Sequence, residues 1–217
     1  MATTSRPSSS LDSDSVGDFF RLHGRALGLV AGAALLAVGA TAAWRWNRSS
    51  QGERAEAAYF QALNAPGGAE NPARAEAALR QVAQGYDGTM GGAQAQMTLA
   101  QLLFDQGKYQ EGLQVLQNAS DAPEPLRPGV QLLTAAGHEG LNRFADAAKL
   151  YESLASNAKA EATRDQMLAS AARAYAAGND RASATRIWQQ LASREGAPVA
   201  DEARVRLGEL AAAAATR

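Results

Sequence analysis

The segment Leu99–Ala119, with the sequence LAQLLFDQGKYQEGLQVLQNA, decides the fold of this chain. A small residue, Ala100, precedes a Gly107-x-Tyr109 break, and a large residue, Leu116, follows it. Apolar residues on both sides of the break recur at helical spacing. The segment therefore predicts two helices joined by a short turn, which is a helical hairpin.

The same pattern recurs along the rest of the chain. The small residues Ala100, Ala135 and Ala172 are 35 and 37 residues apart. The large residues recur at intervals of 37, 35 and 37, at Leu79, Leu116, Tyr151 and Trp188. A hairpin of this size cannot bury its apolar stripe alone, so stacked copies must share a core. The predicted fold class is all-α, with an α-solenoid of about four helical hairpins over residues 51–217.

The last segment, Pro198 to Ala214, predicts a capping helix. One stripe of this helix is apolar and consists of Val199, Ala203, Leu207 and Leu210. Charged residues occupy the other positions, at Asp201, Glu202, Arg204 and Arg206. A helix with one apolar and one polar side is suited to close the end of a solenoid against solvent.

The composition excludes several classes of function. With 21 basic and 22 acidic residues the net charge is −1, so no basic excess exists to bind nucleic acid phosphates. The absence of cysteine excludes disulfides, thiolate metal sites and thiol nucleophiles. Alanine, at 51 of 217 residues, favours closely packed helices. Common catalytic motifs are absent and His138 falls at a packing position, so we predict no enzyme, cofactor, metal or small-molecule substrate.

A run of 19 uncharged residues extends from Ala26 to Trp44 and is flanked by arginines. At about 1.5 Å per residue a helix of this length spans roughly 28 Å, close to the roughly 30 Å hydrocarbon core of a bilayer. We predict a transmembrane helix over 26–44, within an anchor segment over 18–50. Its face of Gly28, Gly32, Leu35 and Gly39 would let a second helix approach closely. The alternative is that glycine is simply common in membrane helices.

The residues before the span, 1–17, are rich in Ser, Thr, Pro and Asp and predict a disordered tail. A cleaved signal peptide is the alternative to an anchor, because Thr41-Ala42-Ala43 offers small residues near a possible cut. The neutral N-terminal region and the length of the apolar run favour the anchor. Charge does not set the orientation, since arginines flank both ends. A short hydrophilic tail before a large domain favours a cytoplasmic N-terminus.

The repeat pattern resembles the tetratricopeptide repeat, a helical hairpin of about 34 residues. The stretch Gln106-Gly107-Lys108-Tyr109 matches the turn of that family, whereas Gly112 replaces its usual Ala, and Asn142 and Asn179 replace its Gly. The resemblance implies that the first helices of successive hairpins line a concave groove. The residues at the groove positions are Gln94, Met97, Gln101, Phe104, Asp105, Leu132, Ala136, Glu139, Gln166, Ala169 and Arg173. This mixture suits an apolar and polar protein segment, although Met97 and Phe104 equally suit packing between repeats.

A longer series of motifs is similar to the bacterial ancillary subunit of the SecYEG translocon. It comprises Phe19-Phe20-x2-His23-Gly24-Arg25, the glycine-bearing span, Trp44-Arg45-Trp46-Asn47, Ala57-Ala58-Tyr59 and Gly91-x-Ala93-x-Ala95-x-Met97. The resemblance implies a single-span inner-membrane protein with a periplasmic repeat domain. It also implies non-enzymatic handover of emerging polypeptides between the translocon and a membrane-bound periplasmic chaperone.

We therefore expect a membrane-anchored protein–protein interaction module, an accessory factor of the Sec translocon in the bacterial inner membrane. The alternative is an envelope scaffold for cell-wall or outer-membrane assembly with the same fold. Partner identity separates these two hypotheses.

Overall fold

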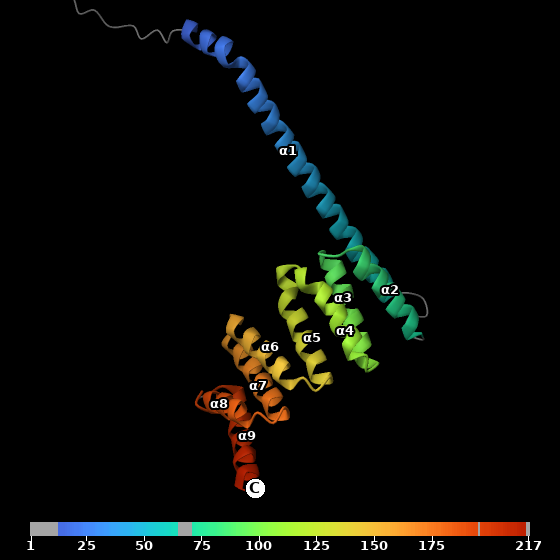
Figure 1. Ribbon diagram of the computed structural model, residues 1–217, viewed down its shortest axis with the longest axis vertical. Coiled ribbons are helices and arrows are strands. Elements are labelled where there is room, and N and C mark those ends of the chain that lie inside the picture. Colours follow the sequence, from blue (N-terminus) through green and yellow to red (C-terminus); the bar gives the residue numbers. More distant parts are fainter. Residues whose placement is uncertain (1–12, 65–70, 195, 216–217) are drawn as a thin grey trace, which may run out of the picture. The chain divides into compact units, whose positions relative to one another are not determined.

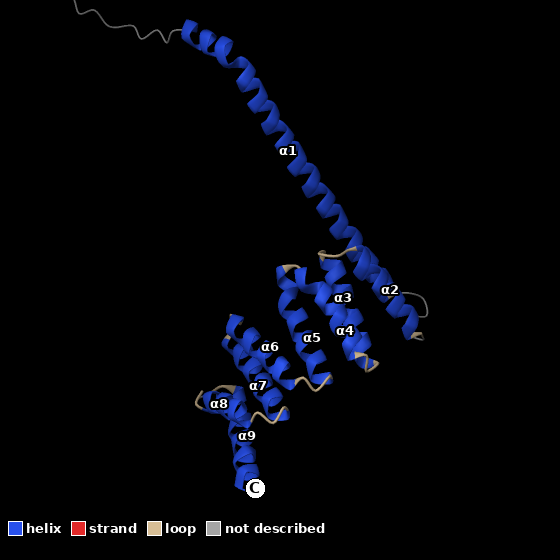
Figure 2. Ribbon diagram, viewed as in Figure 1, coloured by secondary structure: helices blue, strands red, loops and turns tan. Residues whose placement is uncertain are grey.

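The computed structural model describes residues 13–64, 71–194 and 196–215, without the side chains of 13–35, 44, 48, 214 and 215. In this part of the chain every regular element is a helix (Figure 2). The α-helices are α1 Ser13–Leu63, α2 Pro72–Gly85, α3 Met90–Asp105, α4 Tyr109–Asn118, α5 Arg127–Gly140, α6 Phe144–Asn157, α7 Glu161–Ala177, α8 Arg181–Ala192 and α9 Pro198–Ala215. Two short 3₁₀ helices, η1 Ala119–Asp121 and η2 Glu124–Leu126, connect α4 to α5. The chain divides into two compact units, Met1–Ser50 and Gln51–Arg217.

The unit Gln51–Arg217 is a stack of helical hairpins (Figure 1). Helices α3 and α4, α5 and α6, and α7 and α8 pair as hairpins, and each pair packs against the next. The first hairpin is formed by the C-terminal turns of α1 with α2, whose Leu79 and Val82 share a buried cluster with Ala62. This arrangement confirms the predicted all-α repeat solenoid.

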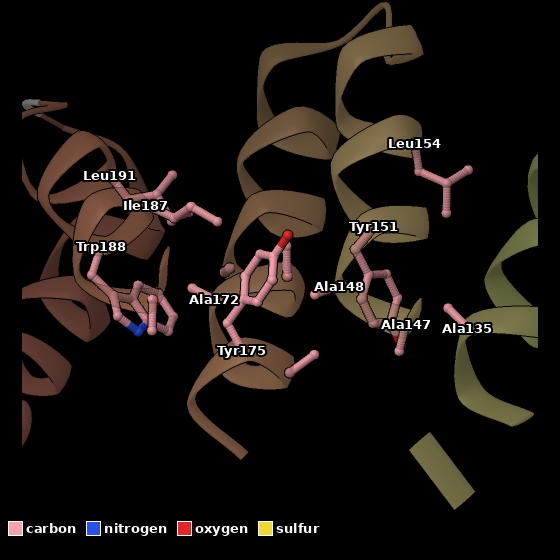
Figure 3. Close-up of a cluster of buried hydrophobic side chains, with 14 of the residues drawn as sticks. Ala135, Ala147, Ala148, Tyr151, Leu154, Ala172, Tyr175, Ile187, Trp188 and Leu191 are labelled. Carbon is pink, nitrogen blue, oxygen red and sulfur yellow. The ribbon is translucent and has the colours of Figure 1, made fainter. Parts of the chain in front are cut away.

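The phased residues of the sequence form the core of the stack. The small residues Ala100, Ala135 and Ala172 are fully buried where helices meet. The large residues Leu79, Leu116, Tyr151 and Trp188 are all at least nine-tenths buried. Figure 3 shows Tyr151, Tyr175 and Trp188 placed between successive helices. Burying each large side chain stabilises the fold by about 1.5–3 kcal/mol. Because the buried residues are the ones that recur, the period observed in the sequence is also the period of the core.

Each of the three complete hairpins turns through the same backbone conformation. Gly107, Asn142 and Asn179 have φ angles of 75°, 56° and 63°. In each case the next residue donates its backbone N–H to a carbonyl five residues earlier, as Lys108 does to Leu103 at 2.8 Å. This is the Schellman ending of a helix, which needs a left-handed residue. Asparagine tolerates that conformation better than other non-glycine residues, which explains how it replaces glycine in two of the turns.

A glycine also sets the closest approach of α1 to α3. A Cβ atom at Gly91 would lie 2.4 Å from the backbone carbonyl carbon of Ala55, which is fully buried. Nearby, the hydroxyls of Tyr59 and Thr98 are 3.0 Å apart and form a hydrogen bond between the same two helices. The last turns of α1 are therefore built into the solenoid.

Helix α9 packs against α8 and α7 at the end of the stack. Ala203 is fully buried, and Val199, Leu207 and Leu210 pack against the core cluster that contains Trp188. Its charged residues are exposed or half-buried. The apolar stripe predicted for this segment therefore faces the core.

The N-terminal predictions fall partly outside the described residues. Residues 1–12 of the predicted tail are not described, whereas α1 already begins at Ser13, so residues 13–17 are helical. Among the residues that the structure describes, no helical stretch combines the length and the hydropathy of a membrane span. The structure does not describe the side chains of residues 26–35 and 44 of the predicted span.

Candidate functional site

The predicted groove residues come from α3, α5 and α7, and two of them are not accessible. Phe104 and Ala169 are 6% and 1% exposed. The predicted groove is therefore corrected at these two positions, because a side chain in the core cannot contact a partner. The remaining nine residues are exposed or half-buried, and their role in binding stays a prediction.

Phe104 is buried because glycines make room for its ring. A Cβ at Gly112 of α4 would lie 2.4 Å from Phe104 Cε1, and one at Gly137 of α5 would lie 2.6 Å from its Cζ. The ring also packs against Tyr109, with centroids 5.6 Å apart. Phe104 therefore fills the junction between two hairpins, and its slot explains why Gly112 stands where the family has Ala.

Met97, another apolar residue of the predicted groove, lies beside Phe104's cluster. It is half-buried and packs against the cluster that contains Phe104. A Cβ at Gly129 would lie 2.8 Å from its Cε atom. For both residues, packing between repeats is therefore the arrangement that the structure shows.

Several polar groove residues are bonded to other side chains of the chain. Gln101 donates to Asp105 at 3.0 Å. The Tyr151 hydroxyl donates to Glu139 at 3.3 Å, and burial, followed by the charge of Glu139, raises the pKa of Tyr151 to about 12.

Arg173, the predicted cation of the groove, is paired with the capping helix. Its guanidinium donates to Glu202 of α9 at 2.7 Å and to Ser170 at 3.2 Å. The positive charge at this end of the predicted groove is therefore offset by α9, which the repeat pattern did not reveal.

A large hollow of the described surface lies elsewhere, where α5 and α7 begin and α6 ends. We call it the α5–α7 cleft. It has a volume of about 900 Å³. Its lining residues are Glu124, Pro125, Arg127, Pro128, Gly129, Gln131, Leu132, Leu154, Asn157, Ala158, Lys159, Ala160, Thr163 and Met167. Of the predicted groove residues only Leu132 lines it, and this side chain is 42% exposed.

The connections between helices shape this cleft. Between α4 and α5 the chain makes two 3₁₀ turns, and Pro123, Pro125 and Pro128 prevent one continuous helix. Arg127 ties the segment down by donating Nε to the carbonyl of Ala122 at 3.1 Å. Between α6 and α7 the backbone is extended at Ala158 and Ala160. The proline-rich break was visible in the sequence, but its position beside the α6–α7 connection was not.

None of the other described candidate residues lines the cleft. The face of Gly28, Gly32 and Leu35 lies outside the described side chains, and a Cβ at Gly39 would meet nothing within 4 Å. Among the described residues, no group of His, Asp or Glu side chains is arranged to hold a metal ion. His138 is half-buried, and within the same residues its Nδ1 atom has no hydrogen-bond partner.

Comparison with known proteins agrees with this fold. A family model described as a tetratricopeptide repeat-like domain matches residues 18–127, just over half of the chain, so the chain belongs to that family. The matched family is typical of protein–protein interaction scaffolds. No curated protein matches the chain.

Among solved structures, the chain is similar to the crystal structure of a putative kinesin light chain from Podosopora anserina with nearly identical tetratricopeptide-like repeats. The two chains are 19% identical, with a TM-score of 0.56. The match covers 78% of this chain and 87% of the other. At this level of identity the similarity shows a shared fold.

Proposed function

We propose that this chain is a protein–protein interaction module that binds segments of partner proteins in the α5–α7 cleft. One observation carries the proposal. A hollow of about 900 Å³ lined by α5, α6 and α7 leaves Leu132 42% exposed beside Met167 and two prolines. Concave sites with an apolar lining and a few polar groups are the usual form of binding sites in proteins.

Site-specific photocrosslinking tests the proposed site. A photoreactive residue at position 132 in the full chain is expected to give discrete adducts with partner proteins in native membranes. The control position is 205, where Val205 of α9 is exposed outside the cleft. The same adducts at both positions, or none at position 132, would contradict a docking role for the cleft.

We further propose that the module is membrane-anchored and assists the Sec translocon. The uncharged run Ala26–Trp44 supports an anchor, and the resemblance described above supports the translocon. In this proposal the N-terminus is cytoplasmic and the repeat unit is periplasmic. The partners are the translocon, a membrane-bound periplasmic chaperone and emerging polypeptides.

The anchor is tested by alkaline carbonate extraction of membranes that contain the full chain. An integral protein stays in the membrane pellet, whereas a peripheral one is released. Protease treatment of spheroplasts then tests topology, because a periplasmic repeat unit is digested there and protected in inverted vesicles. Release by carbonate would overturn the anchor, and the reverse protease pattern would overturn the orientation.

Copurification from gently solubilised membranes tests the partners. Recovery of translocon subunits together with a periplasmic chaperone is the expected result. Recovery of cell-wall or outer-membrane assembly proteins in their place would favour the alternative proposal, an envelope scaffold built on the same repeats.

A further inference from the structure

We propose that the α5–α7 cleft selects an extended segment in which an apolar side chain lies next to carboxylates. This inference rests on the proposed function and specifies the chemistry of the partner. It follows from the distribution of charge around an apolar surface.

The apolar part of the cleft is made by side chains from three helices. Leu132 of α5, Leu154 of α6 and Met167 of α7 line it together. Leu154 is 8% exposed and belongs to the core cluster, so it forms the floor, whereas Leu132 is open to solvent. Methionine adapts to different partner shapes. This surface suits one or two apolar side chains of a bound segment.

The charged side chains of the cleft are unequal in sign. Two cations, Arg127 and Lys159, and one acid, Glu124, line it. Within the described residues Lys159 makes no ion pair or hydrogen bond. The only side-chain bond of Arg127 there is the one from Nε to a carbonyl, which leaves its terminal nitrogens without a partner. Two cations are therefore available to a ligand.

The backbone adds to this positive potential. The first turns of α5 and α7 border the cleft through Gly129 and Thr163, and neither helix has a side-chain N-cap. By contrast, Asn71 and Thr89 cap the first turns of α2 and α3. The N-terminal end of a helix carries a partial positive charge. Glu161 in the first turn of α7 does not line the cleft, and it shares the guanidinium of Arg194 with the buried Asp165.

These features together favour a negatively charged ligand. An acidic flank would meet Lys159 and Arg127 while the neighbouring apolar side chain rests on Leu132 and Met167. A basic flank would meet the same two cations and two positive helix ends, with Glu124 as the one carboxylate among the lining residues. The cleft thus discriminates by repulsion as well as by attraction.

Labelled peptides binding to the full chain in detergent test this inference. The peptides share a Leu-Phe centre and have flanks of Glu, Lys or Ser, and fluorescence anisotropy measures their affinity. The Glu-flanked peptide is expected to bind about tenfold more tightly than the Lys-flanked one at low salt. The difference should shrink as salt is added.

Charge and apolar variants locate the binding. Lys159→Glu is expected to weaken binding of the Glu-flanked peptide about three- to tenfold and to leave binding of the Ser-flanked peptide nearly unchanged. Its matched control is Lys149→Glu, an exposed lysine of α6 outside the cleft. Leu132→Ala should weaken the binding of all three peptides, and its control is Val205→Ala.

The possible results separate this inference from the function it rests on. Leu132-dependent binding with no preference for the Glu flank would overturn the acidic specificity and leave the docking cleft in place. Binding that depends on neither Leu132 nor Lys159 would overturn both. Self-association of the chain that Leu132→Ala abolishes would identify a second copy as the occupant and would also overturn the inference.

Discussion

Two junctions of the same solenoid differ in how they are filled. Between the second and third hairpins, the Phe104 ring occupies a slot opened by Gly112 and Gly137. Between the third and fourth hairpins, alanines and Tyr151 close the middle, but one end is open as the α5–α7 cleft.

Equivalent positions of the two junctions carry different residues. Glu139 stands one repeat after Phe104, and Ala147 stands one repeat after Gly112. In the first junction a large side chain is combined with glycine, and in the second a half-buried carboxylate is combined with alanine. Paired changes of this kind preserve the packing volume while the backbone repeats. Neither Glu139 nor Ala147 lines the cleft, so the middle of a junction is set by such paired residues, whereas its open end is shaped by the connections between helices.

The largest expected effect is loss of the Phe104 ring. Phe104→Ala should destabilise the chain by about 3–5 kcal/mol, because a closed slot between glycines cannot collapse. Urea unfolding followed by circular dichroism measures the change. Phe60→Ala is the control, since Phe60 is 61% exposed and should cost less than about 1 kcal/mol. Equal effects of both variants would show that Phe104 does not fill the junction.

A methyl group in the slot should have the next largest effect. Gly112→Ala is expected to cost about 1–3 kcal/mol, because its Cβ would lie 2.4 Å from Phe104 Cε1. Combining it with Phe104→Leu should cost less than the sum of the two single changes, since the smaller side chain frees the space. Simple additivity would contradict the direct contact. Gly208→Ala, with nothing within 4 Å, is the neutral control.

The fourth hairpin depends on a polar link that high pH should weaken. Tyr175 of α7 donates its hydroxyl to Glu152 of α6 at 2.8 Å, and Arg186 of α8 donates to the same carboxylate at 2.8 Å. Burial, followed by the bond and the charge of Glu152, raises the pKa of Tyr175 to about 12.

Because the folded pKa of Tyr175 is above the ordinary value of 10, its contribution is complete below pH 10 and is lost as pH rises towards 12. The contribution is at most about 2–3 kcal/mol. Unfolding titrations between pH 9 and about 12 should show a shallower loss of stability for Tyr175→Phe than for the parent chain. Identical pH dependence of the two proteins would rule out this contribution.

The smallest expected effect is in the open junction. Leu132→Ala should change the free energy of unfolding by less than about 1 kcal/mol, because its side chain is 42% exposed. Leu154→Ala, in the floor of the same cleft and 8% exposed, should cost about 2–5 kcal/mol. A large cost for Leu132→Ala would indicate that this residue supports the fold, and its use as a binding variant would fail.

The sequence by itself determined the architecture of the repeat unit. Ala100, Ala135 and Ala172 recur with the period of the hairpin, and the structure buries all of them because each repeat meets its neighbour in the same way. The turns were equally visible, since Gly107 and Asn142 are residue types that adopt positive φ. Local backbone preferences and a fixed period are both properties of a single chain segment.

Only the tertiary structure decided which of the predicted groove residues are accessible and where the surface is hollow. Phe104 occupies a groove position of the repeat, yet two glycines from other helices leave space for its ring in the core. Arg173 is paired by Glu202, which lies outside the repeats. The α5–α7 cleft arises where a proline-rich connection meets the segment around Lys159. These outcomes depend on contacts between segments far apart in sequence, and a repeat period carries no information about them.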